Sequence, residues 1–162
     1  LTAILAAGGL IGFSWASRVL SKGSDPFRMA SLGALIGIPA FVFIILSASL
    51  LQKNLFIAGA FLIGFGGGLF SHGTLTATMQ MAPEDQRGLA LGAWGAVQAT
   101  AAGFAIGLGG IMRDIVVALG DASWIPEGLI SPTTGYFLVY CLEIVLLIAT
   151  ILSMIKLIYK KV

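Results

Sequence analysis

Five apolar stretches, each long enough to cross a lipid bilayer, constrain the fold of this chain more than any other feature. The hydrocarbon core of a bilayer needs about 20 apolar residues of helix. Only 10% of the 162 residues are charged and the mean hydropathy is +1.02, whereas about a quarter of the residues of a soluble domain are charged. We therefore predict an all-α membrane protein with five transmembrane helices. The expected helices cover residues 2–20, 30–51, 55–81, 89–117 and 135–157.

The first residues do not have the pattern of a secretion signal. The chain begins at Leu1 and enters an apolar stretch directly, without the basic segment that opens a signal peptide. We expect the sequence to be the C-terminal part of a longer protein. Pro39 lies inside an expected span, where we expect it to kink the helix because its ring clashes with the carbonyl of the preceding turn.

Basic residues are distributed unevenly between the two ends of the expected bundle. One end has Lys53 and Arg113, and the other has the remaining seven: Arg18, Lys22, Arg28, Arg87, Lys156, Lys160 and Lys161. Because basic loops stay on the cytoplasmic side, we expect a cytoplasmic C-terminus and Leu1 on the opposite side. Segment 118–134 then lies outside, where Trp124 is expected to anchor an amphipathic loop at the membrane surface.

Three polar side chains are expected deep within the spans. His72 and Gln98 lie at similar depths and can share one layer of the bundle, whereas Glu143 falls in the outer half of its helix. Ionisable residues inside membranes are functional candidates. His72 has three interpretations: a metal ligand, including an axial ligand to the magnesium of a chlorin, a proton relay, or a hydrogen-bonded structural residue. Glu143 is an intramembrane acid of unknown role, either protonated and hydrogen-bonded or paired with a residue outside this chain.

The fourth expected helix carries small residues at every fourth position, at Gly95, Ala99, Gly103 and Gly107. They fall along one helix face, and such a face lets two helices approach closely in lipid. Trp94 and Gln98 lie on another face, and an amide inside a membrane needs a hydrogen-bonding partner. This helix is therefore predicted to pack closely against another helix and to be suited to holding a ligand.

The sequence contains no arrangement of residues typical of an enzyme. Cys141 is the only cysteine and His72 the only histidine, which excludes an intrachain disulfide and the Cys/His zinc motifs. Glu84 and Asp85 follow a proline near an expected helix start, where carboxylates interact favourably with the helix dipole. The net charge of +2 gives no indication of nucleic-acid binding. We therefore expect a protein that is not an enzyme.

Three segments resemble the PucC family, membrane proteins of phototrophic bacteria that are distantly related to major facilitator transporters. The segments are GLALGAWGAVQATAAG at 88–103, GGIMRD at 109–114 and GTLTATM at 73–79. The resemblance implies a twelve-helix bundle made of two six-helix halves. Residues 1–162 then correspond to the C-terminal half-bundle without its first helix, and the N-terminal half is absent.

The resemblance also implies a role in assembling the light-harvesting antenna, by docking antenna polypeptides, by delivering bacteriochlorophyll, or both. The implied partners are antenna polypeptides and the reaction centre–antenna core complex, in the bacterial inner membrane and its photosynthetic intracytoplasmic extensions. Bacteriochlorophyll is the cofactor to consider. If a chlorin binds, we expect His72 as its ligand, Gln98 as a hydrogen-bond donor and Trp94 as a flat packing surface.

The main alternative is a secondary transporter that moves a small solute by alternating access between two rocking halves. Segment 21–28 has only a degenerate form of the Gly-x-x-x-Asp-Arg-x-Gly loop of facilitators. A transporter needs a polar site near the membrane midplane, and few charged groups are expected there. An enzyme of pigment synthesis would need acidic metal ligands or a cofactor motif, and neither is present in this sequence. The sequence therefore favours an assembly factor.

Overall fold

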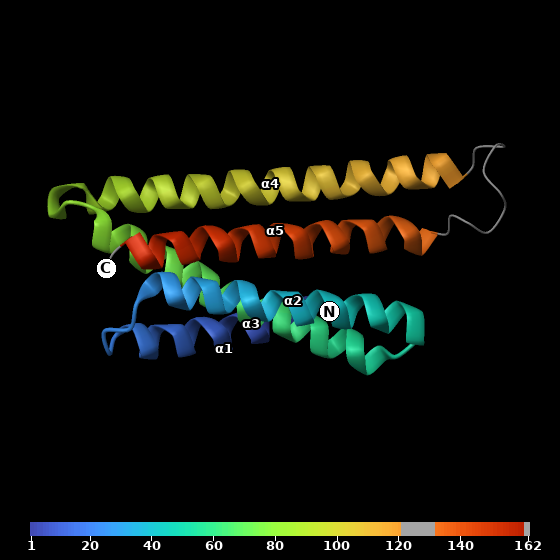
Figure 1. The fold of residues 1–162 in the computed structure, drawn as a ribbon, viewed down its shortest axis with the longest axis horizontal. Helices are drawn as coiled ribbons and strands as arrows, with labels where there is room; N and C mark the ends of the chain where they lie inside the picture. The colour runs from blue at the N-terminus through green and yellow to red at the C-terminus, as the bar shows by residue number, and fades with distance from the viewer. Residues whose placement is uncertain (121–131, 161–162) are drawn as a thin grey trace.

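The computed structural model describes residues 1–120 and 132–160, which form five long helices (Figure 1). In chain order the elements are α1 (Thr2–Leu20), α2 (Pro26–Leu50), α3 (Lys53–Met81), the short 3-10 helix η1 (Glu84–Gln86), α4 (Arg87–Gly120) and α5 (Pro132–Lys160). By length and composition, five helical segments can cross a membrane. The prediction of an all-α protein with five transmembrane helices is therefore confirmed. Trp124, predicted to be an interfacial anchor, lies outside the described residues.

The second helix begins four residues earlier than its hydropathy indicates. The carboxylate of Asp25 accepts a hydrogen bond of 3.0 Å from the backbone N–H of Arg28 and so caps the helix. Pro26 occupies the first helical position, where its missing N–H has no helical partner to lose. The helix then continues through Pro39 without interruption, and the kink expected there stays a prediction.

Helix α3 makes the most extensive contacts among the described helices and runs behind α1 and α2 in the view of Figure 1. It packs along both α1 and α2, which hardly touch each other, and α5 packs on the other side of α2. Helix α4 lies at the edge beside α5, with a smaller contact to α3. A small core cluster of Ala16, Met29 and Leu69 fills the space where α1, α2 and α3 meet. The first three helices therefore form the tightly packed part of the chain.

Glycines bring the backbone of α3 into direct contact with both neighbours. A Cβ atom added to Gly68 would lie 2.5 Å from the carbonyl oxygen of Gly9 in α1. A Cβ added to Gly66 would lie 2.7 Å from the carbonyl oxygen of Gly33 in α2. Real Cβ atoms essentially never come within 3.0 Å of another atom in this way, and the same crowding occurs at Gly8, Gly12, Gly33, Gly59, Gly64 and Gly73. Small residues thus set the spacing of these helices, as expected for packing in lipid.

Gly67 differs from the glycines on either side of it. Successive residues of a helix point about 100° apart, so Gly66 faces α2, Gly68 faces α1 and Gly67 faces neither. A Cβ atom added to Gly67 meets nothing within 4 Å. Packing among the described residues therefore does not require a glycine at this position.

These three adjacent glycines allow a matched test of the packing. We expect Gly66→Ala and Gly68→Ala each to lower the free energy of unfolding by about 1–3 kcal/mol, because the added methyl group overlaps backbone atoms. Gly67→Ala should be neutral or stabilising by up to about 1 kcal/mol, because alanine favours the helix. Unfolding of the purified protein by SDS titration in mixed micelles measures all three. Equal stability of the three variants would contradict the packing described here.

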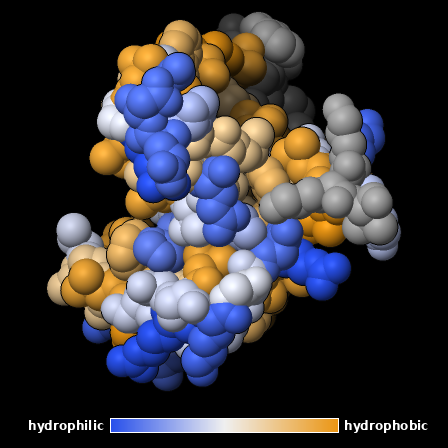
Figure 2. Space-filling view, turned by 90° about the vertical axis from the view of Figure 1, so that its left-hand side faces the viewer, coloured by the Kyte–Doolittle hydropathy of each residue, from blue (hydrophilic) through white to orange (hydrophobic). Residues whose placement is uncertain are grey.

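The two ends of the bundle differ in their number of basic residues. The α1–α2 connection, the start of α4 and the C-terminal turns of α5 meet at one end (Figure 1). Hydrophilic side chains gather on this end (Figure 2). Its described basic residues are Arg18, Lys22, Arg28, Arg87 and Lys156. The fold thus brings together these members of the basic set found in the sequence, while the compartment that they face stays a prediction.

Candidate functional site

His72 lies on the side of α3 that faces α1, one turn beyond Gly68. Its ring packs edge-on against the ring of Phe13, with centroids 4.2 Å apart and an interplanar angle of 66°. The side chain is half-buried, and its Nδ1 atom is buried without a hydrogen-bond partner. Nδ1 therefore gives no support to the interpretation of His72 as a hydrogen-bonded structural residue. A buried unpaired nitrogen is unusual, because losing a hydrogen bond on burial costs about 1–3 kcal/mol.

Trp94 connects α4 to α3 through a single side-chain hydrogen bond. Its indole Nε1–H donates to the hydroxyl oxygen of Thr74 at 3.2 Å. The Thr74 hydroxyl in turn donates to the carbonyl oxygens of Phe70, at 2.9 Å, and Ser71, at 3.1 Å. Both polar groups are thereby satisfied inside the apolar part of the bundle, which is what lipid requires. The sequence analysis did not single out Thr74. The N–H of an indole inside a protein usually finds a hydrogen-bond acceptor, and a hydroxyl on a neighbouring helix is one.

The contacts made by His72 and Trp94 lie on different sides of α3. Thr74 follows His72 by two residues, so the Trp94 contact lies roughly 200° around α3 from the His72–Phe13 contact. Gln98 is half-buried one turn further along α4. A metal-bound histidine usually donates a hydrogen bond from its second ring nitrogen, and Nδ1 has no acceptor. Joint binding of a chlorin by His72, Gln98 and Trp94 stays a prediction.

The small-residue face of α4 is open along most of its length. A Cβ atom added to Gly95, Gly103 or Gly107 meets nothing within 4 Å, and Ala99 is exposed. A shallow groove of about 430 Å³ follows this face, lined by residues that include Gly103, Phe104, Gly107 and Ile111. No helix of the described ranges covers it. The close helix packing predicted for α4 is therefore not formed among residues 1–120 and 132–160. The face that would form it is open to a partner.

Glu143 lines a cavity of about 300 Å³ between α2, α3 and α5. The walls are mostly apolar and include Gly37, Phe41, Gly67, Phe70 and Leu147. Glu143 is half-buried, and its carboxyl group makes no hydrogen bond or ion pair with any residue that the structure describes. Residues 1–120 and 132–160 therefore show no hydrogen bond to Glu143, and both interpretations of this residue stay predictions. The carboxyl group is left accessible from the cavity.

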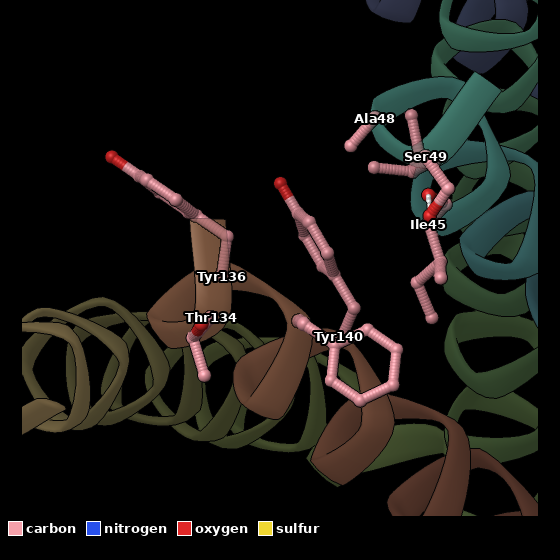
Figure 3. A pocket seen from close by; sticks show the side chains of 8 residues that line it. Ile45, Ala48, Ser49, Thr134, Tyr136 and Tyr140 are labelled. Atoms are coloured by element: carbon pink, nitrogen blue, oxygen red, sulfur yellow. Dashed lines mark hydrogen bonds between the residues drawn. The ribbon is translucent and has the colours of Figure 1, made fainter. Parts of the chain in front are cut away.

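A second cavity, of about 240 Å³, lies near the start of α5 (Figure 3). Tyr136 and Tyr140 of α5 line it together with Ile45 and Ser49 of α2, and Tyr140 lies between Tyr136 and the α2 residues in Figure 3. The rings of Tyr140 and Phe41 are 5.8 Å apart, and the Ser49 hydroxyl donates to the backbone of its own helix. The sequence analysis did not single out these tyrosines. Their spacing of four residues near the end of an apolar helix is typical of aromatic anchors at a membrane surface.

The family described as "PUCC protein" matches residues 1–162, which is the whole chain. The chain belongs to this family. The resemblance stated from segments 73–79, 88–103 and 109–114 is therefore confirmed.

Curated members of the PUCC family include close relatives of the chain. Protein PucC of Rhodovulum sulfidophilum is 62% identical over 116 residues, which are 72% of this chain and 26% of that protein. Protein PucC of Cereibacter sphaeroides is 51% identical over 157 residues, or 97% of this chain and 33% of that protein. Protein PucC of Rhodobacter capsulatus is 48% identical over 158 residues, or 96% and 34%.

The chain spans about a third or less of the length of these relatives. No solved structure is a significant match to it. The arrangement of a twelve-helix major-facilitator bundle, implied by the resemblance, thus stays a prediction for the PUCC family member described here.

A double-mutant cycle tests the bond between α3 and α4. We expect Trp94→Phe and Thr74→Val each to lower the free energy of unfolding, with a coupling energy of about 0.5–1 kcal/mol, the usual size for a hydrogen bond between membrane helices. SDS titration of the two single variants and the double variant measures the coupling.

Trp15→Phe is the matched control, because Trp15 packs near Phe65 at a ring distance of 6.3 Å and forms no hydrogen bond with the described residues. Additive effects of Trp94→Phe and Thr74→Val would show that the bond contributes nothing.

Proposed function

We propose that this chain is part of a membrane assembly factor for bacterial light-harvesting antenna complexes. Membership of the PUCC family supports the proposal, together with the antenna-assembly role that the resemblance to PucC proteins implies. The structural observation that carries it is the open small-residue face of α4. The partner proposed for that face is the membrane-spanning helix of an antenna polypeptide.

The physical argument rests on how helices associate in lipid. Apolar side chains gain nothing by leaving lipid for another apolar surface, so close backbone approach and hydrogen bonds drive the association. Within this chain, α1, α2 and α3 already use glycines in this way. Gly103 and Gly107 provide the same kind of surface on α4 and have no neighbour within the described ranges. A single-span polypeptide can therefore dock there without any rearrangement of the five helices.

The role proposed here involves no catalysis by the chain. The proposed location is the bacterial inner membrane and its photosynthetic intracytoplasmic extensions, with the reaction centre–antenna core complex nearby. Bacteriochlorophyll is proposed as cargo delivered to the antenna.

Docking on α4 is tested by co-purification from a phototrophic host. We expect Gly103→Leu and Gly107→Leu to reduce the antenna polypeptides recovered with the tagged full-length protein by about tenfold, because the added side chain separates the helices. Ala105→Leu is the matched control, since Ala105 is also exposed but points roughly 200° away from Gly103. Quantitative mass spectrometry measures the recovered polypeptides. Equal recovery with all three variants would contradict docking on this face.

Orientation gives a separate test of the proposed topology. In a Cys141→Ala background, a cysteine placed at Ser21 should react with an impermeant maleimide only from the cytoplasmic side, because the basic end is retained there. A cysteine at Gln52, in the α2–α3 connection at the opposite end, should react only from the other side. Labelling of inside-out and right-side-out vesicles distinguishes the two. The reverse pattern would show that the chain is inverted.

A further inference from the structure

The cavity between α2, α3 and α5 places a carboxyl group in the middle of the membrane. Glu143 is eleven residues from the first residue of α5 and seventeen from the last. These separations correspond to about 16 and 26 Å along the helix axis. The hydrocarbon core of a bilayer is about 30 Å thick, so the carboxyl group lies within it. An ionised carboxylate at this depth is costly unless a positive centre or a proton neutralises it.

Gly67 supplies a second, independent observation at the same cavity. It lies on α3 opposite the α5 residues and lines the space that Glu143 also lines. Gly66 and Gly68 are required by contacts with α2 and α1, but Gly67 makes no contact that would exclude a side chain. Glycine inside a helix costs about 1 kcal/mol relative to alanine. A glycine without a packing role here keeps the floor of the cavity clear beside an unpaired acid.

The remaining walls indicate what kind of molecule fits. Phe41, Phe70 and Leu147 supply flat or branched apolar surface. The hydroxyl of Thr150 donates to the carbonyl oxygen of Leu146 at 2.8 Å and is already satisfied. Among the described side chains that line the cavity, Glu143 is therefore the polar group free to bind a ligand.

Depth and chemistry together limit the class of ligand. Cationic lipid headgroups stay at the membrane surface, more than a helical turn from Glu143 at either end. A ligand that reaches the carboxyl group must therefore be apolar overall, and it can bind a carboxyl oxygen if it carries a Lewis-acidic centre internally. A magnesium chlorin has this form, because its metal ion sits in the middle of a planar apolar ring. Magnesium prefers oxygen ligands, and carboxylate suits it better than imidazole does.

We propose that Glu143 is the magnesium ligand for a chlorin bound at the cavity between α2, α3 and α5, with Gly67 leaving room for the ring. This inference rests on the pigment-delivery part of the proposed function. It assigns the pigment to Glu143 in place of His72, whose ring faces α1.

Pigment titration of the full-length protein in lipid nanodiscs tests the assignment. The probes are bacteriochlorophyll a and its magnesium-free derivative, bacteriopheophytin a, and the readout is the dissociation constant from the shift in pigment absorption. We expect the native protein to bind the magnesium pigment about tenfold more tightly than the magnesium-free one, because the magnesium-free pigment cannot form the bond between the metal and Glu143. Glu143→Gln, which keeps the size of the side chain, should reduce this ratio to about one.

Two further variants locate the ring and provide a control. Gly67→Leu should weaken binding of both pigments by about tenfold, because its side chain fills the cavity floor. Glu84→Gln removes a carboxyl group from the exposed 3-10 helix and should leave both dissociation constants unchanged. Size-exclusion chromatography and the SDS unfolding midpoint confirm that each variant is folded. If Glu143→Gln does not fold, Gly67→Leu tests whether the ring binds in this cavity. Glu143→Asp then tests whether the carboxyl group causes the preference for the magnesium pigment.

Three outcomes would overturn the inference. The first is an unchanged ratio in Glu143→Gln, and the second is loss of the ratio in His72→Ala. The third is a native protein that binds neither pigment. Co-purification of antenna polypeptides separates these failures from failure of the proposed function, because docking on α4 persists if only the pigment site is wrong.

Discussion

Direct contact between helix backbones at the glycines of α3 is the constraint on which the rest of the bundle depends. In lipid, apolar side chains provide little net attraction between helices, so the distance of approach decides how strongly two helices associate. Gly68 and Gly66 allow that approach on two different sides of α3. Once α1 and α2 occupy those sides, α4 can reach only the remaining circumference of α3, and α5 packs on α2 and α4 instead.

This arrangement explains why the polar residues of the spans do not converge. Each neighbour of α3 takes a different sector, and each sector contains one polar feature. His72 faces α1, Thr74 meets Trp94 of α4, and the cavity of Glu143 opens toward α2 and α5. The separation is a consequence of helix geometry, because residues two positions apart lie on nearly opposite sides.

Much of the fold could be predicted from the sequence, whereas the site could not. Hydropathy depends on composition alone, so it located all five helices and erred only at their ends, as at Pro26, where Asp25 caps the helix. The periodicity of Gly95 to Gly107 indicated a close-packing face, but a repeat cannot state which helix packs on it. For the same reason the sequence could not distinguish the roles of Gly66, Gly67 and Gly68. All three are glycines, and they differ only in the atoms that lie opposite them.

The placement of the tight contacts has a consequence for synthesis at the ribosome. The glycine contacts of α3 with α1 and α2 all lie between Gly8 and Gly73, so this three-helix unit is complete before α4 has been translated. Helix α4 then enters the membrane with a hydrogen bond to α3 and an exposed glycine face, before α5 has been made. The nascent chain therefore already presents this face to newly made single-span helices, and the face stays open after α5 has packed on α2.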